Sequence, residues 1–525
     1  MAMRITTKMM QNRSLNNLNT NKALQEKLTT QLSTMKKITR PSDDPVIAIR
    51  SLKLNASLDK IDQYYEKNSK DAASWLQLTE SAIDTTNDIL TGMRKYINQA
   101  AHGPLEASDR AAILENLSNF KYEIYATGNA DSDGRSIFTG YRTNTPLTFK
   151  EDKTDETYKI TEQWNNSCLD VETFVKTGDL EEINEGNFTT KTTTEYEVDT
   201  YEIARIRMAY DNLDIDKTTN PPTANISLQT WDADGNMVKD YTPNPNPVVC
   251  FNGATDDAYM TAVNDPDAIV YIAETGELLL GKNVQAELAE LSAETEIRVT
   301  YEKSDWKKDD LDPIHYFYTE RTMPNGTGTK TLVYNEDKLT DPMGQNAQQI
   351  IEYDIGNNQS IRVNTTADEI FTHDIGRDID EVVTMLEQYQ TILDTQDTVK
   401  GMIASGKYDG EELTKLEEQL AGLEKAATMA KDKVQKTCEG LLTTFDGYLK
   451  QGALAQTDCG SRESRLELIQ NRLSAQQTNF QELVSENEDA DVTDLAIQLS
   501  SVELTYEAAL SSISYVMQTS LLDFL

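Results

Sequence analysis

The sequence predicts a mainly α-helical protein with an inserted β-rich region. Heptad-spaced apolar residues occur near both ends of the chain, while a middle stretch alternates Val, Ile, Tyr and Thr with turn residues. We expect helices from both termini to form a long coiled-coil rod, to which a β-rich middle domain and a helical hairpin are added. Because a heptad seam cannot bury itself alone, each terminal helix needs a partner helix.

The first expected element is a polar helix over residues 5–35. Its many Asn and Thr residues make it a weak helix former, so it should order only against another helix. Its thin apolar stripe comprises Leu15, Leu18, Leu24, Leu28, Leu32 and Met35.

A proline-rich break follows at residues 40–45. Pro41 and Pro45 stop a helix, and Asp44 followed by Pro45 suits the N-cap and first position of the next one. The heptad then continues over about 45 residues, which predicts a rod helix over 46–102 with Tyr65 and Trp75 in its core. Asn68 lies either in the coiled-coil seam, where a buried Asn fixes the register of the two helices, or on the solvent-facing side of the helix. A third rod helix, capped by Ser108, is expected to end at Gly128.

The residue pattern changes after this third helix, from helical spacing to short apolar stretches. Short apolar stretches separated by turn residues are typical of hairpins. The expected strands and turns are Ile226–Thr230, the turn at 232–235, Ile269–Ile272, Leu278–Leu280 and Ile297–Tyr301. The middle region is therefore interpreted as one or two β-rich domains.

Helical patterns return at 378–400 and 411–450, and the break between them predicts a helical hairpin. A rod helix over 461–486 should follow, with a seam of Leu466, Ile469, Leu473, Gln476, Phe480 and Leu483. The expected divisions are 1–40, 41–145, 146–376, 377–455, 456–490 and 491–525.

The clearest heptad lies at the carboxyl end, beyond an acidic joint at 486–491. Spacing of three and four residues recurs there without Gly or Pro, so we expect a helix over 492–525 that pairs with the helix over 5–35. The seam comprises Val492, Leu495, Leu499, Val502, Tyr506, Ala509, Ile513 and Val516, with Leu521 and Phe524 beyond them.

Charge supports this pairing and excludes some functions. The 88 acidic and 49 basic residues give a net charge of −39, which argues against nucleic acid as a partner. Residues 1–40 carry a charge of about +7 and residues 461–525 about −8, so the two ends should attract each other. No apolar run is long enough to span a membrane, and no secretory signal pattern opens the sequence.

The sequence offers little for catalysis. Its three histidines (His102, His315 and His373) are far apart, the four cysteines lack metal-ligand spacing, and no nucleotide-binding or hydrolase motif occurs. The acidic stretches at 131–134 and 232–236 lack the full pattern of a calcium loop and are interpreted as β-turns. We therefore expect no enzyme activity, no metal site and no cofactor.

Three stretches resemble the flagellin superfamily. Residues 32–38 and the Arg-Pro-Ser-Asp-Asp-Pro break resemble that family's turn between terminal and rod helices, although Met35 stands where the family usually has Gly. The break, residues 129–141 and residues 506–525 are more similar to the members that join hook and filament than to flagellin. The resemblance covers about residues 3–145 and 455–525.

This resemblance implies an extracellular structural protein of the bacterial flagellum, exported by the type III apparatus without a cleaved signal peptide. The implied partners are hook-associated protein 1, flagellin, other copies in a ring, and an export chaperone. Flagellin itself, a cytoplasmic coiled-coil scaffold and an enzyme in the β-rich middle remain alternatives. The expected assembly surface is the stripe of Leu18, Leu28, Leu32, Leu495, Leu499, Val502, Tyr506, Ala509, Ile513 and Val516, with Pro41, Asp44 and Pro45 forming the break and cap.

Overall fold

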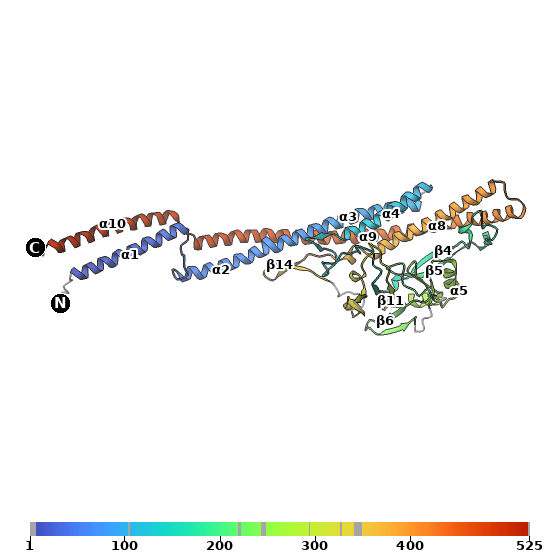
Figure 1. Ribbon diagram of the computed structural model, residues 1–525, viewed down its shortest axis with the longest axis horizontal. Coiled ribbons are helices and arrows are strands. Elements are labelled where there is room, and N and C mark those ends of the chain that lie inside the picture. Colours follow the sequence, from blue (N-terminus) through green and yellow to red (C-terminus); the bar gives the residue numbers. More distant parts are fainter. Residues whose placement is uncertain are drawn as a thin grey trace. The chain divides into compact units, whose positions relative to one another are not determined.

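The two ends of the chain fold together, and the middle is inserted between them. The computed structural model describes residues 7–102, 106–218, 222–242, 248–292, 295–325, 328–340 and 349–522. It divides into unit 1 (Met1–Ala73, Tyr353–Ile361 and Ser464–Leu525) and unit 2 (Ser74–Glu352 and Arg362–Glu463). The predicted class, a mainly helical chain with a β-rich insertion, is confirmed (Figure 1).

Unit 1 consists of long helices and one hairpin. Its elements are α1 (Thr7–Thr34), α2 (Pro45–Asp62), the π-helical turn η1 (Gln63–Asn68), the start of α3 (Ser69–His102), the end of α9 (Gly410–Glu488), α10 (Val492–Leu522) and the hairpin of β14 (Glu352–Gly356) and β15 (Gln359–Arg362). Helices α2 and α9 run antiparallel, since Gln477 donates to Asp62 Oδ1 at 2.8 Å and Asn487 to the carbonyl oxygen of Ile47 at 3.2 Å.

The π turn between α2 and α3 holds the hairpin against the helices. Ser69 N donates to the carbonyl oxygen of Tyr64, five residues back. Asn68 Nδ2 reaches the carbonyl oxygen of Asp354 in β14 at 2.7 Å. From α9, Arg472 donates to Gln359 Oε1 at 2.6 Å. Asn68 is therefore half-exposed, and its amide binds the hairpin backbone and not a partner helix in a seam.

Unit 2 combines a helical layer with two sheets (Figure 1). Its helices are most of α3, α4 (Ala107–Gly128), α5 (Asp256–Asn264), α6 (Lys282–Ala289), α7 (Glu336–Thr340), α8 (His373–Ala404) and the first part of α9. Its strands are β1 (Asp131–Ser132), β2 (Arg135–Ser136), β3 (Thr157–Trp164), β4 (Asp170–Lys176), β5 (Asp199–Arg207), β6 (Ser227–Trp231), β7 (Met237–Asp240), β8 (Val249–Phe251), β9 (Ile269–Ile272), β10 (Glu277–Leu280), β11 (Glu296–Lys303), β12 (Tyr318–Asn325) and β13 (Gly328–Tyr334).

In the described part of unit 2 the long strands form two sheets. The six-stranded sheet has the order β13-β12-β3-β11-β6-β7, and the five-stranded sheet has the order β4-β5-β10-β9-β8. Neighbouring strands are antiparallel except β8 and β9, which are parallel. An aromatic cluster of Phe149, Tyr158, Tyr210 and Trp306, with ring centroids 5.0 to 5.9 Å apart, fills the core beside the larger sheet.

The expected strands are all present, within one or two residues at their ends. Both acidic stretches are turns, as predicted: Asp133 and Gly134 have φ of 52° and 75°, the left-handed pair that joins a tight hairpin, and Gly235 (φ 77°) closes the turn between β6 and β7.

Several helix boundaries differ from the expectations. Helix α4 begins at Ala107 with Glu106 at the N-cap, so Ser108 is inside the helix. Helix α8 continues through Gly401 to Ala404, and the turn is made by residues including Gly406 (φ 63°) and Gly410 (φ 59°). Helix α9 is one helix of 79 residues that includes both of the segments predicted separately at 411–450 and 461–486.

Candidate assembly surface

Helices α1 and α10 pack against each other as an antiparallel pair (Figure 1). Leu495 near the start of α10 is 7% exposed and Leu28 of α1 is 4% exposed. The other described side chains of α10 that are partly shielded are Leu499, Val502, Tyr506, Ala509 and Ile513. The heptad residues from Leu495 to Ile513 thus face α1, while the intervening side chains up to Ser514 are exposed. Val492, predicted as the first seam residue, is 47% exposed and does not belong to the seam. The side chains of Val516 and Leu521, and the whole of Phe524, lie outside the described part of the chain.

The matching face of α1 also repeats at three and four residues, but it is mostly polar. Its shielded residues are Gln11, Ser14, Leu18, Asn21, Gln25, Leu28 and Leu32. Leu15 and Leu24 are exposed, on either side of this face. A seam with only three leucines buries little apolar surface, so the pair gains modest stability from the hydrophobic effect.

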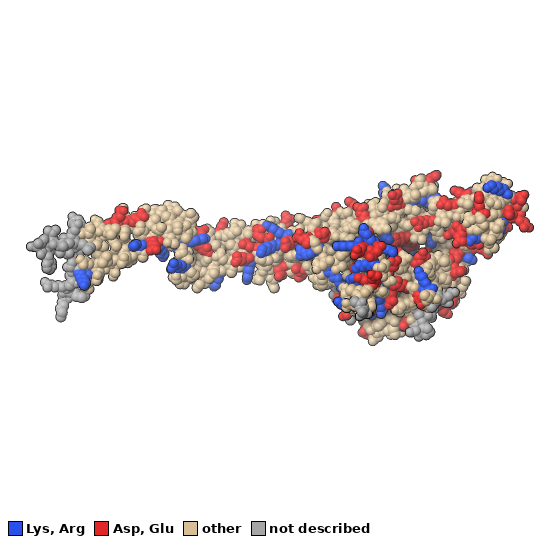
Figure 2. Space-filling view, viewed as in Figure 1, with Lys and Arg blue, Asp and Glu red and all other residues tan. Residues whose placement is uncertain are grey.

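Charge complements this weak seam. Figure 2 shows acidic side chains on the α10 side of the pair and basic ones on the α1 side. Between Val492 and Leu525 the sequence has no Lys or Arg, whereas α1 has one acid, Glu26. Gln25 Nε2 donates to Glu503 Oε1 at 3.4 Å across the pair. These surface contacts are worth little one by one and weaken with salt.

The proline-rich break gives α2 a defined start. Asp44 has extended backbone angles, and its Oδ1 accepts from Val46 N at 2.9 Å and Ile47 N at 3.2 Å, which makes it the N-cap. Pro45 occupies the first helical position, where its missing N–H leaves no bond unmade. Asp43 Oδ2 accepts from Arg40 N at 2.9 Å and so closes the turn that contains Pro41.

Beside this break, the end of α1 is fastened to the joint between α9 and α10. Lys36 and Asp489 form an antiparallel bridge, with Lys37 N donating to the carbonyl oxygen of Glu488 at 2.7 Å and Ala490 N to that of Met35 at 3.0 Å. Lys36 Nζ lies 2.7 Å from Asp489 Oδ1 and 3.1 Å from Glu488 Oε2. We call this set of contacts the terminal clasp.

Glu488 is the centre of the terminal clasp. Its Oε1 accepts from Asn55 at 2.7 Å and from the Ser51 hydroxyl, both on α2, while its Oε2 pairs with Lys36. One carboxylate therefore joins α2, α9 and the end of α1. The hydrogen bonds from Ser51, Asn55 and Lys36 hold the pKa of Glu488 below its usual range, and the Lys36 ammonium lowers that of Asp489.

These shifts predict that the clasp weakens in acid. A carboxyl whose pKa is lowered on folding stabilises the fold above its unfolded pKa, and this contribution is lost as pH falls through the folded pKa. We expect Glu488→Gln to melt unit 1 at a lower temperature than wild type at pH 7, and the difference to shrink as the pH falls through the lowered pKa of Glu488. Circular dichroism at 222 nm measures this, with exposed Glu482→Gln on the same helix as control. A difference that stays constant as the pH falls would contradict it.

Met35 ends α1 in a left-handed conformation. Its φ is 55°, which costs a side chain with a Cβ about 1–2 kcal/mol and suits Gly instead. The side chain is 60% exposed, so removing it loses little packing. The position at which the sequence departs from the family's Gly thus keeps the bend and carries the strain.

Replacing Met35 by Gly should strengthen the clasp by about 0.5–1 kcal/mol, since relief of strain outweighs the added flexibility of Gly in the unfolded chain. Met35→Ala is the control, because it shortens the side chain and keeps the strain. Hydrogen exchange at Lys37 N and Ala490 N, both bonded within the clasp, should slow about two- to fivefold for Gly alone. If hydrogen exchange slowed equally in Met35→Gly and Met35→Ala, relief of backbone strain would not be the cause of the stabilisation.

The clasp residues were not predicted from the sequence. The acidic joint at 486–491 and the basic N-terminal region pointed to attraction between the ends, but nothing singled out Lys36, Ser51, Asn55 or Glu488. Glu488 lies more than 430 positions from the other three, and their meeting depends on the antiparallel packing of α2 and α9.

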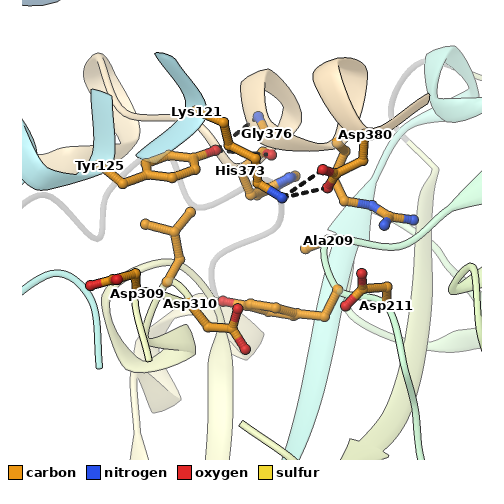
Figure 3. Close-up of a pocket in the computed structure, with 12 residues that line it drawn as sticks. Lys121, Tyr125, Ala209, Asp211, Asp309, Asp310, His373, Gly376 and Asp380 are labelled. Carbon is orange, nitrogen blue, oxygen red and sulfur yellow. Dashed lines mark hydrogen bonds and ion pairs between the residues drawn. The ribbon is translucent and has the colours of Figure 1, made fainter. Parts of the chain in front are cut away.

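Unit 2 contains a small cavity where α4 and α8 approach the β-rich part (Figure 3). Lys121 pairs with Asp380 at 2.6 Å, and the Tyr125 hydroxyl accepts from Gly376 N at 2.9 Å. Asp211, Asp309, Asp310 and His373 also line it. Its volume of about 70 Å³ holds about two water molecules, whereas ligand pockets measure about 300–1,000 Å³.

Several titratable side chains of unit 2 are shielded in its packed interior. His315 Nε2 lies 3.0 Å from the carbonyl oxygen of Pro146, and burial lowers the pKa of this imidazole to about 4. Cys250, Cys438 and Cys459 are buried thiols, and burial raises the pKa of each. Within the described ranges no three His, Cys, Asp or Glu side chains are grouped to hold a metal ion.

Comparison with known proteins places these terminal regions in a family. Residues 5–143 match the model of the bacterial flagellin N-terminal helical region, and residues 442–525 match that of the bacterial flagellin C-terminal helical region. The two terminal regions of the chain thus resemble those of the flagellin superfamily.

Within that superfamily the chain is similar to flagellar hook-associated protein 3. It is 31% identical to that of Salmonella typhimurium over 142 residues, which is 27% of this chain and 44% of the relative. It is 29% identical to that of Escherichia coli over 29% of this chain and 47% of the relative. A flagellin of Clostridium tyrobutyricum is 29% identical over 24% of this chain and 33% of its own length.

The chain thus spans about half the length of the hook-associated relatives that it matches. The solved structure of flagellar hook associated protein-3 from Legionella pneumophila aligns over 82% of this chain and 97% of its own, at 11% identity and a TM-score of 0.27. A superposition this loose carries no argument. The relatives are components of the bacterial flagellum, and they are structural proteins. No helix in the described part of the chain has the length and hydropathy to cross a membrane.

Proposed function

We propose that this chain is an extracellular structural protein that joins hook-associated protein 1 to the flagellin filament. The observation that carries the proposal is the α1–α10 pair fastened by the terminal clasp, in a chain whose two terminal regions match those of flagellins. In this proposal the chain acts by binding other flagellar proteins through the surfaces of its terminal helices.

The assembly surface in this proposal comprises α1, α10 and the clasp. The heptad residues, from Leu495 to Ile513 on α10 and Leu18, Leu28 and Leu32 on α1, pair the two helices within one copy. The outer faces of the same helices then meet neighbouring copies, hook-associated protein 1 and flagellin. Pairing thus precedes assembly in this proposal, because an unpaired α10 would expose its apolar seam as well as its outer face.

The chain would be exported by the flagellar type III apparatus with a dedicated chaperone and would assemble as a short ring outside the cell. Its basic, acid-poor start supports export of this kind, and the weak α1–α10 seam supports it further, since a loosely paired terminus unfolds at little cost.

Deleting the gene tests the proposal. Cells should keep their hooks, lose their filaments and release flagellin into the medium, and a plasmid copy should restore filaments. Short or normal filaments in the deletion strain would contradict the junction role.

Flagellin is the second candidate, and the similarity to the clostridial flagellin favours it. The two differ in whether the chain polymerises on itself. Purified chain added to filament seeds should cap them without elongation, as seen by electron microscopy, if it is a junction protein. Long filaments made of this chain alone would establish flagellin instead.

A further inference from the structure

The side of α2 that faces away from α9 is apolar. Val46, Ile49 and Leu52 are 76%, 56% and 70% exposed, and their three-residue spacing puts them on one side of the helix. The opposite face, with Ala48 and Ile61, is buried in unit 1. Arg50 and Lys53 flank the exposed residues. We call Val46, Ile49 and Leu52 the α2 outer stripe.

Helix α10 has a comparable face. Ile497 and Leu504, one heptad apart, are 64% and 72% exposed, and they lie opposite the seam that faces α1. The positions between and beyond them are the small residues Ser501 and Ala508, and Asp494 and Glu507 flank the stripe. We call Ile497 and Leu504 the α10 outer stripe.

Both stripes belong to unit 1, and neither is covered by its own chain. Exposed apolar residues scattered singly are ordinary, but aligned ones on a helix mark a contact surface. Burying one such side chain is worth about 1.5–3 kcal/mol. The two stripes differ in sign, because basic side chains flank one and acidic side chains the other.

We propose that the α10 outer stripe docks on the α2 outer stripe of the next copy of this chain. The inference rests on the proposed function, and it specifies which surfaces copies use to contact one another. Each copy offers one stripe of each kind, so the contact is heterologous and each copy both receives and donates. Contacts of this type generate closed rings or helical arrays.

The flanking charges select this pairing over like-on-like contacts. Two α10 stripes together would face Asp494 and Glu507 with the same carboxylates, and two α2 stripes would face Arg50 and Lys53 with the same cations. Like charges across an interface are repulsive, whereas the α10–α2 pairing sets carboxylates against cations.

Cysteine cross-linking in assembled flagella tests the pairing. Four double variants combine Ile49→Cys or Leu52→Cys with Ile497→Cys or Leu504→Cys in the full chain. Isolated flagella are oxidised and separated without reductant. At least one pair should give dimers and larger species, while each single cysteine should give none. Ile49→Cys with Thr505→Cys is the matched control, since exposed Thr505 lies one residue along from Leu504 and off the stripe.

The outcomes separate the two proposals. If the chain is present in isolated flagella by mass spectrometry and none of the four pairs cross-links, the docking inference is wrong and the junction role stands. If a single cysteine cross-links to its own kind, the contact is like-on-like and the inference is again wrong. If the chain is absent from flagella, the proposed function fails and the inference fails with it.

Discussion

Replacing Leu499 and Ile513 by Asp should abolish filament attachment while the chain is still exported. Both residues lie on the seam between α10 and α1, and a charge placed there loses the burial of an apolar side chain and is itself poorly solvated. The pair should open, so cells keep hooks, carry no filaments and release flagellin. Export should persist, because the basic N-terminal region is unchanged.

The same variant should leave unit 2 folded. All four tryptophans, Trp75, Trp164, Trp231 and Trp306, belong to unit 2, so the urea transition followed by their fluorescence should be unaltered. Thr505→Asp with Ser512→Asp is the matched control, since it adds the same charge at exposed positions of α10. Normal swimming of the seam variant would exclude the seam from assembly, and a shifted fluorescence transition would place α10 in the core of unit 2.

Replacing Arg205 by Met should destabilise unit 2 by about 3–5 kcal/mol, the cost of leaving buried charges without their partner. The Arg205 side chain on β5 is 4% exposed and lies 2.6 Å from Glu277, 2.7 Å from Glu381 and 3.1 Å from Glu172. These carboxylates come from β10, α8 and β4, so one guanidinium connects the five-stranded sheet to the helical layer. Urea unfolding followed by tryptophan fluorescence measures the effect.

Arg94→Met is the control for charge removal. The Arg94–Asp446 pair has the same chemistry at 2.7 Å, but its side chains are exposed, so its loss should cost less than about 1 kcal/mol. Adding Glu277→Gln and Glu381→Gln to Arg205→Met should recover part of the stability, because fewer buried carboxylates remain unpaired. A cost for Arg205→Met similar to that of Arg94→Met would mean that water reaches the network.

The cap of α2 and several turns and strands, which depend on a few neighbouring residues, were predicted correctly from the sequence. Pro45 and Asp44 mark the start of α2 because a cap needs only the next three residues, and the Asp-Gly turn between β1 and β2 needs only two positive φ angles. Strands β9 and β11 follow from β-branched and aromatic runs between turn residues. The helices α5 and α6 were not predicted, since each has eight or nine residues and depends on packing against its sheet.

The seam of α9 illustrates where periodicity misleads. The heptad predicted Gln476 and Leu483 on the inner face, whereas Gln477 and Val484 are the shielded residues and Leu483 is exposed. An α-helix turns every 3.6 residues, so a seam read with a strict period of 3.5 drifts by about 20° per heptad. Over two heptads from Leu466 this drift moves the predicted residue off the inner face, so the residue that follows it is shielded instead.

The sequence predicted the apolar seam of α10 that faces α1, but it did not predict the terminal clasp. The heptad from Leu495 to Ile513 follows from spacing alone, and charge predicted that the ends attract. The clasp requires that Lys36, just beyond the end of α1, meets Asn55 of α2 and Glu488 of α9. This meeting depends on how α2 packs against α9. The unit 2 cavity likewise arises from tertiary packing, and no sequence pattern marks it.

The π turn at Gln63–Asn68 also bears on how the length of this chain can vary. A π turn holds one residue more than an α turn, so it absorbs a single-residue insertion without shifting the helix on either side. Deleting one residue here would restore a regular helix and rotate Asn68 away from Asp354, freeing the hairpin while sparing α2 and α3. Deletion of one residue is therefore tolerable at this turn, whereas an insertion or deletion of one residue elsewhere in the long helices would rotate every later seam residue by about 100°.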